Sequence, residues 1–281
     1  MQAESGIFIS QQKYATDLIE RFNMLGCKET ATPANSNEKL QSNDGSGDAN
    51  AKRYRSLIGD LIYLSYIQPD IMYAVSLVLR FMAKPSKHQF RAAKRIMRYI
   101  ARTTDYGIWY GATNELKLQG FVDSDWAGSV DDRRSTSGNL FMLGSGIVSW
   151  SSKKQTVTSL STTEAEYIST CSVACQAVWL RSLLADMGKE ELEATPIECN
   201  NKSTISIAKN PSHHGRTKHI DIKFHYIREL ITNGIINLQF CSSDQQLADI
   251  FTKALPIHRS IELRKKLRVC NFQSGECVRS D

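Results

Sequence analysis

The sequence lacks the long apolar runs and the leader layout that mark membrane-bound and exported proteins. No stretch of about 18 consecutive apolar residues is present, which argues against a membrane-spanning helix. The amino terminus, MQAESGIFIS, lacks the basic segment followed by an apolar segment that is typical of a signal peptide. We therefore expect an intracellular chain, cytoplasmic or nuclear, that does not contact a membrane.

Paired metal-ligand spacings are also absent. The seven cysteines are odd in number and scattered, without the spacing of a zinc site or of a disulfide framework, so we expect reduced and mostly buried thiols. His213, His214, His219 and His225 have no cysteine partners at zinc-finger spacing. This favours loop and helix positions for them, with His219 or His225 as a candidate contact with substrate.

Length and charge set broad limits on what is present. A chain of 281 residues with 41% hydrophobic content can form one large or two modest domains, each with its own core. The formal net charge of +6 is compatible with an acidic partner such as nucleic acid, but many proteins without such a partner carry the same excess. Charge alone does not decide the function.

The first part of the chain predicts a smaller, mainly helical unit. Residues 33–52 are polar and rich in Gly, Asn and Ser, which predicts a mobile loop. Apolar residues recur at helical spacing on both sides of this loop. Helices are expected within 8–25, 54–67, 70–83 and 87–103, followed by a strand over YGIWYG.

From residue 116 the apolar period changes to that of strands. LKLQGFVD alternates, and two further apolar runs are joined by Gly144-Ser145-Gly146, which predicts three consecutive antiparallel strands. A long helix follows, with Ser161 or Thr162 as its N-cap. Alternating elements come next, and the fold class is therefore α/β with a mixed sheet. Strands are expected over 195–200 and 235–241, and helices over 161–187, 201–209, 219–232 and from Ser242 or Ser243 onward.

Carboxylates stand where several of these elements begin or end. Asp123 ends the first strand, Glu164 or Glu166 opens the long helix, and Asp249 lies in the first turns of the last helix. A cluster of acidic groups is costly unless cations neutralise it, and two Mg²⁺ ions about 4 Å apart would do so while holding a phosphoryl group. Each residue also has a structural reading: Asp125 can cap a turn, Glu164 can belong to a capping box, and Asp249 can complement a helix dipole.

Six segments, taken in order, resemble the ribonuclease H domain of copia-type LTR retrotransposon Pol polyproteins. They are FVDSDWAG, DDRRSTSG, SWSSKKQTVTSLSTTEAEY, NKSTISIAKNP, HHGRTKHIDIKFHYIRE and DQQLADIFTKAL. Upstream, GIFISQQKYATDLIERFNMLGCKETATP and YRSLIGDLIYLSYIQPDIMYAVSLVLRFMAKPSKHQF resemble the thumb and connection region of the same polyprotein's reverse transcriptase.

The resemblance implies a ribonuclease H-like mixed five-stranded sheet with helices over 116–256. A smaller, mainly helical connection-like region would precede it over 1–115, and a helical tail would follow over 257–281. SVDDRR contains Val-Asp-Asp but lies where this family carries a basic loop, so no polymerase active site is expected in the chain.

The resemblance also implies a catalytic set. Asp123, Glu166 and Asp249 correspond to Mg²⁺ ligands. Glu164 and Glu166 lie about 200° apart on a helix, so both cannot face one site, and the choice of Glu166 rests on the resemblance. The family carries CDN at the fourth position, whereas this chain reads Cys199-Asn200-Asn201. Asn200 offers one neutral oxygen in place of an anion, so two-metal hydrolysis of RNA in RNA/DNA hybrids is expected to be weak or absent.

The partners implied are an RNA/DNA hybrid or a duplex, and the rest of the Pol polyprotein. Six basic residues in loops or at element ends are candidates for phosphate contacts. They are Arg133, Arg134, Lys153, Lys154, Arg216 and Lys218. The alternative functions are a non-catalytic remnant that binds nucleic acid and an inert product of a degenerate element.

Overall fold

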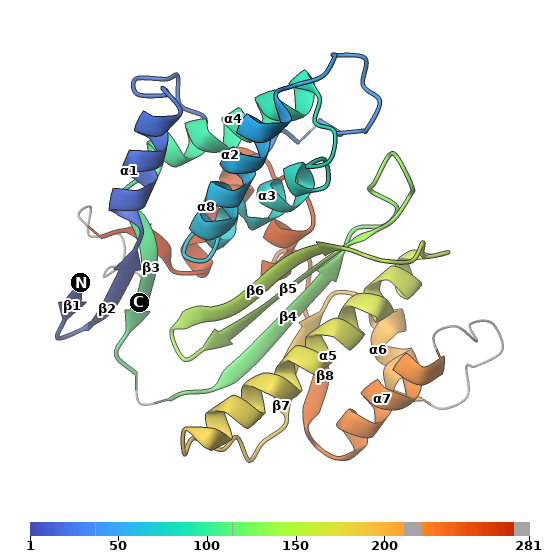
Figure 1. The fold of residues 1–281 in the computed structure, drawn as a ribbon. Helices are drawn as coiled ribbons and strands as arrows, with labels where there is room; N and C mark the ends of the chain where they lie inside the picture. Colours follow the sequence, from blue (N-terminus) through green and yellow to red (C-terminus); the bar gives the residue numbers. More distant parts are fainter. Residues whose placement is uncertain (37, 114, 211–220, 273–281) are drawn as a thin grey trace. The chain divides into compact units, whose positions relative to one another are not determined.

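The computed structural model describes every residue except 37, 114, 211–220 and 273–281. The chain forms two compact units (Figure 1). The first, which we call the helical unit, comprises residues 1–113, 129–132 and 253–281, and the second, the sheet unit, comprises 114–128 and 133–252. Arg216 and Lys218 lie outside the described residues, as do His213, His214 and His219.

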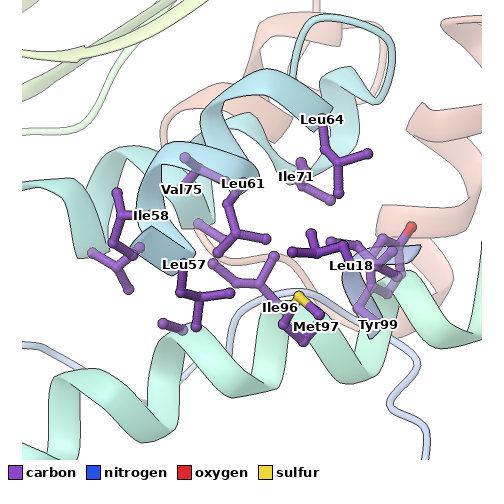
Figure 2. Close-up of a cluster of buried hydrophobic side chains, with 14 of the residues drawn as sticks. Leu18, Leu57, Ile58, Leu61, Leu64, Ile71, Val75, Ile96, Met97 and Tyr99 are labelled. Atoms are coloured by element: carbon purple, nitrogen blue, oxygen red, sulfur yellow. The ribbon is translucent and has the colours of Figure 1, made fainter. Parts of the chain in front are cut away.

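Helices α1 to α4 form the core of the helical unit, in which apolar side chains such as Leu57, Leu61 and Ile96 are fully or almost fully buried (Figure 2). A four-stranded antiparallel sheet in the order β1-β2-β3-β9 belongs to the same unit. Its elements are β1 (Gln2–Ala3), β2 (Gly6–Ser10), α1 (Gln12–Arg21), α2 (Ala51–Leu64), η1 (Pro69–Ile71), α3 (Met72–Leu79), α4 (Lys87–Arg102), β3 (Tyr106–Gly111), α8 (Ile257–Lys266) and β9 (Val269–Asn271).

Both ends of the described chain contribute to this unit. The expected helix within 8–25 is shorter, because strand β2 precedes it and Phe8 packs with Trp109, Cys270 and Phe272. Beyond residue 256, the chain forms α8 and then β9, which pairs antiparallel with β3. The residues after the sheet unit therefore complete the fold of the residues before it.

The polar loop over 33–52 is anchored to the start of α4. Ser86 caps α4 by accepting the Gln89 N–H, and its hydroxyl donates to Asp44 at 2.5 Å. His88 lies 2.6 Å from Glu38, measured from Nε2 to Oε1. Short polar side chains thus hold a segment for which composition alone predicts mobility.

Asp44 is expected to make this anchor sensitive to acid. Hydrogen bonds from Ser86 and Ser46 lower the pKa of Asp44 from 3.8 to about 2. Between about pH 4 and pH 2 the folded protein then binds fewer protons at this carboxyl than the unfolded chain, so its stabilisation is complete above that window and lost as the pH falls through it. We expect Asp44→Asn to weaken the pH dependence of the urea midpoint between pH 5 and pH 3. The exposed Asp48→Asn variant is the control and should keep the wild-type dependence; equal slopes for all three proteins would contradict the assignment.

The sheet unit contains a five-stranded mixed sheet in the order β6-β5-β4-β7-β8. Strand β4 pairs antiparallel with β5, and β5 pairs antiparallel with β6, whereas β4 and β8 each pair parallel with β7. The predicted mixed sheet with three antiparallel leading strands is confirmed. The elements are β4 (Leu118–Ser124), β5 (Thr136–Leu143), β6 (Gly146–Lys154), α5 (Thr162–Asp186), β7 (Thr195–Cys199), α6 (Lys202–Lys209), α7 (Asp221–Thr232), β8 (Ile236–Phe240) and η3 (Leu247–Phe251).

Helix α5 packs against β4 and β5, with α6 and α7 beside it (Figure 1). Its N-cap is Ser161, one of the two predicted candidates. Among the described helices, α5 is long and apolar enough to cross a membrane by length and composition alone, but its buried Val173, Ala174 and Ala177 belong to the core of the unit. Among the described residues, five cysteines are free thiols, namely Cys27, Cys171, Cys175, Cys199 and Cys241. Cys270 is disulfide-bonded, so the prediction of reduced thiols is wrong there.

Candidate functional site

The central strand of the sheet ends in a buried carboxylate. Asp123 is 3% exposed and lies near the end of β4, opposite Gly138 of β5. A Cβ at Gly138 would lie 2.8 Å from Phe251 Cβ and 3.1 Å from the Ala248 carbonyl oxygen. Only glycine therefore allows η3 to pack so closely against β5, and η3 carries Asp249.

Asp249 belongs to a single 3₁₀ turn rather than to the first turns of a longer helix. Its side chain is 6% exposed. Two neighbours that the sequence analysis missed tie this turn to β4: Thr252 donates its hydroxyl to Asp123 Oδ2, and Gln246 donates to the Val122 carbonyl oxygen at 2.9 Å. Their place directly on either side of LADIF is the signal that could have found them.

The structure distinguishes the two glutamates at the start of α5. Glu164 Oε2 accepts the Leu160 N–H at 2.8 Å, and the Glu164 N–H donates to Ser161 Oγ, so Glu164 takes part in the cap that Ser161 forms at the start of the helix. Glu166 Oε1 accepts the Ser124 N–H at 3.2 Å, at the residue next to Asp123. The carboxylate of Glu166 therefore lies beside the end of β4, and its role as a metal ligand stays a prediction.

The two asparagines after β7 also differ. Asn201 caps α6 by accepting the Thr204 N–H at 3.0 Å. Asn200 Nδ2 lies 3.4 Å from Asp123 Oδ1, to which it donates. Both oxygens of Asp123 thus accept hydrogen bonds from neutral groups, Asn200 on one side and Thr252 on the other.

Asp125 has a structural role in the same connection. Its Oδ1 accepts the Thr136 N–H, and its own N–H donates to the Thr136 carbonyl oxygen at 3.1 Å. Asp125 therefore joins the end of β4 to the start of β5. Of the two carboxylates in FVDSD, one lies in the cluster and the other holds the turn.

The negative charge of this cluster acts on two buried thiols. Burial, and then the charge of Glu166, raise the pKa of Cys199 to about 12. Burial, and then the charges of Glu198, Asp123 and Asp249, raise the pKa of Cys241 to about 12. Both thiols stay protonated at neutral pH, so neither supplies a thiolate ligand or nucleophile.

Asp123 and Glu166 lie together at the edge of the sheet where β4 ends, and Asn200 donates to Asp123 there. Asp249 lies in η3, the turn that Thr252 and Gln246 tie to β4. Oxygen donors of this kind suit Mg²⁺. The part of the chain that the structure describes nevertheless holds no group of three or more His, Cys, Asp or Glu side chains close enough to bind a metal ion. The carboxylate oxygens fit a cation by chemistry, but the neutral amide of Asn200 lies among them and donates a hydrogen bond to Asp123.

Four basic candidates lie at the same edge. Arg133 and Arg134 precede β5, and the register pairs Ser137 with Lys153 and Thr136 with Lys154. The strand ends that bear these cations are therefore neighbours of the strand end that bears Asp123. Among the four, Arg133 and Lys153 are exposed, whereas Arg134 and Lys154 are half-buried.

The chain is 38% identical over 250 residues to the Pol polyprotein of transposon RE2 from Arabidopsis thaliana, a match that covers 89% of this chain. It is 36% identical over 268 residues to the Pol polyprotein of transposon TNT 1-94 from Nicotiana tabacum, a match that covers 93% of this chain. The chain belongs to the Pol polyproteins of copia-type retrotransposons. This Pol chain spans 17% and 20% of the length of those two relatives.

No family model matches the Pol chain. Among solved structures, LC11-RNase H1 in complex with an RNA/DNA hybrid is 12% identical to it, with a TM-score of 0.37 over 48% of this chain and 94% of that one. The sheet order and strand directions of the sheet unit, together with the family, support a ribonuclease H-like fragment of a retrotransposon Pol polyprotein.

Proposed function

We propose that this Pol chain binds RNA/DNA hybrids or duplexes at the edge of the sheet that carries Asp123, and that it hydrolyses the RNA strand weakly or not at all. The observation that carries the proposal is the contact from Asn200 Nδ2 to Asp123 Oδ1. It places a hydrogen-bond donor where a further anion would otherwise face the buried carboxylates.

Asp123, Glu166 and Asp249 are the residues that would hold Mg²⁺. When bound, Mg²⁺ would neutralise these carboxylates and lower the pKa of an attacking water. The reaction class is hydrolysis, in which water adds to the phosphorus and the 3′-hydroxyl leaves. The chain's own contribution is to carry the three carboxylates on rigid elements, Asp123 on a strand, Glu166 on a helix and Asp249 on a 3₁₀ turn.

Asn200 weakens this arrangement in two ways. Its carbonyl oxygen is a neutral donor, and its NH₂ group is repelled by a cation. That NH₂ group also occupies an oxygen of Asp123 that a metal would need. We therefore propose that Mg²⁺ affinity, rather than the fold, limits hydrolysis.

The basic residues at the strand ends supply the attraction for a phosphate backbone. Each phosphate contact releases counterions, so log affinity should fall with log salt by about 0.9 for each neutralised phosphate of duplex DNA. We expect the double variant Arg133→Ala/Arg134→Ala to lower this slope by about one to two. Fluorescence anisotropy with a labelled hybrid between 50 and 300 mM salt measures it. An affinity that does not depend on salt would favour the inert product.

Cleavage of a labelled hybrid, assayed in Mg²⁺ and in Mn²⁺, tests the catalytic part of the proposal. Weak cleavage that is stronger in Mn²⁺ and lost in Asp123→Asn supports a site impaired at Asn200. Binding without cleavage in either metal supports the alternative, a non-catalytic remnant that binds nucleic acid. The absence of both binding and cleavage contradicts the proposal as a whole.

A further inference from the structure

An exposed tryptophan lies three residues beyond Asp123. The side chain of Trp126 is 52% exposed, yet it is held in place, because its indole N–H donates to the Ser159 carbonyl oxygen at 3.2 Å. This bond joins the connection that follows β4 to the connection that precedes α5. A large apolar ring is thus presented to solvent in a fixed position.

A buried network connects Trp126 to the carboxylate cluster. Ser159 is 4% exposed, and its hydroxyl donates to Gln155 Oε1 at 3.0 Å. Gln155 Nε2 in turn donates to the Ala165 carbonyl oxygen at 2.9 Å and lies 3.3 Å from Ser124 Oγ. Since Ala165 and Ser124 are the chain neighbours of Glu166 and Asp123, the ring is anchored to the elements that carry the site.

Two more exposed apolar side chains accompany Trp126. Leu160 is 76% exposed and shares a peptide bond with Ser159, the acceptor of the indole N–H, and Val157 in the same connection is 41% exposed. The Leu160 N–H is fixed by Glu164 Oε2. We call Trp126, Val157 and Leu160 the Trp126 platform.

Cations on the same two connections indicate which kind of partner the platform suits. Arg133 lies in the connection that contains Trp126, and Lys153 lies just before the connection that contains Leu160; both are exposed. Protein interfaces are depleted of lysine at their centres. Surfaces that bind nucleic acid strands combine cations for the phosphates with aromatic rings on which bases stack.

We propose that the Trp126 platform is a stacking site for a nucleotide of the bound strand, beside the carboxylate cluster. This inference rests on the proposed function of the same site and adds a contact that does not depend on charge. Stacking tolerates any base, so the platform adds affinity and position without sequence preference.

Trp179 offers a matched control. It is 56% exposed, and it lies on α5 thirteen residues beyond Glu166, or about 20 Å along the helix at 1.5 Å per residue. We expect Trp126→Ala to weaken binding of a labelled hybrid by about 5- to 150-fold without changing the salt slope, and Trp179→Ala to change the affinity by less than about twofold. In the wild type and in Trp179→Phe, hybrid should quench tryptophan fluorescence, and Trp126→Phe should abolish most of that quenching. The Phe variants keep a ring, so this second readout stands even if Trp126→Ala unfolds.

Three outcomes would overturn the stacking site. If Trp126→Ala and Trp126→Phe behave as the wild type while Arg133→Ala/Arg134→Ala weakens binding, the platform is no nucleic-acid contact, and the proposed function stands. If Trp126→Ala changes self-association in size-exclusion chromatography but leaves hybrid affinity unchanged, the platform binds protein. If the wild type binds no hybrid even at low salt, the stacking site and the proposed function fail together.

Discussion

The substitution Asn200→Asp is expected to raise Mg²⁺-dependent hydrolysis of the RNA strand of an RNA/DNA hybrid by at least about tenfold. Even groups that only orient metal ligands are worth about 10- to 100-fold in metal affinity or activity, and position 200 faces Asp123 directly. Asn and Asp are almost isosteric, so the packing stays the same and only the charge changes. In the wild type, the donor Asn200 Nδ2 lies 3.4 Å from Asp123 Oδ1, and the substitution places a carboxylate oxygen in its position.

The gain should be larger in Mg²⁺ than in Mn²⁺. Mg²⁺ demands near-ideal octahedral geometry, and Mn²⁺ is bound at such sites with less demand on the ligand set, so the wild-type defect is partly masked by manganese. Asn201→Asp is the matched control, because Asn201 caps α6 and aspartate also caps helices well. The test measures cleavage rates for the wild type, Asn200→Asp and Asn201→Asp in Mg²⁺ and in Mn²⁺. An Asn200→Asp variant that binds hybrid but remains as inactive as its parent would place the lesion elsewhere.

In the helical unit, Arg264→Met is expected to lower the free energy of unfolding by about 3–5 kcal/mol, the range for leaving a buried charge without its compensating charge. Arg264 is 8% exposed and donates to the Tyr99 hydroxyl at 3.1 Å, and Tyr99 donates to the buried Asp70. Burial raises the pKa of Asp70, and the charge of Arg264 opposes that rise. Without the guanidinium, an uncompensated carboxylate remains in the core.

The pH dependence and a second substitution distinguish this cause from lost packing. A carboxyl whose pKa is raised on folding binds its proton more tightly in the folded state, so stability falls as the pH rises from about 4 through the folded pKa. The deficit of Arg264→Met should therefore shrink at pH 5, and Asp70→Asn should recover part of it at pH 7. Lys266→Met, at an exposed position on the same helix, should cost less than about 1 kcal/mol. Urea denaturation of the wild type, Arg264→Met, the double variant Arg264→Met/Asp70→Asn and Lys266→Met measures these effects. A deficit of Arg264→Met that is the same at pH 5 and pH 7 would point to lost packing alone.

The sequence predicted the sheet unit well because its signals are local. Alternating apolar residues over LKLQGFVD and the Gly144-Ser145-Gly146 turn define strands by themselves, and Ser161 defines the start of α5. The helical unit was harder to predict, since β2 depends on contacts with distant residues. In the sequence, Phe8 fits a helical pattern of apolar residues. In the structure, Phe8 lies in β2 and packs against Trp109 and Phe272.

The site was predicted only in part for a similar reason. The periodicity of α5 does not distinguish Glu164 from Glu166, because apolar residues lie on both sides of that helix. The hydrogen bonds to Leu160 and Ser124 distinguish them, and both depend on tertiary structure. Gln155 was missed because a lone buried glutamine has no sequence signature, although it contacts β4, β5 and α5 at once.

Calorimetric titration of Mg²⁺ into the free protein tests the central claim most directly, since it requires neither substrate nor turnover. The account predicts weak binding or none in the wild type and at least about tenfold tighter binding in Asn200→Asp. It also predicts that adding Asp123→Asn to that variant abolishes the gain. Equal Mg²⁺ affinities for the wild type and Asn200→Asp, or a gain that survives the loss of Asp123, would contradict it.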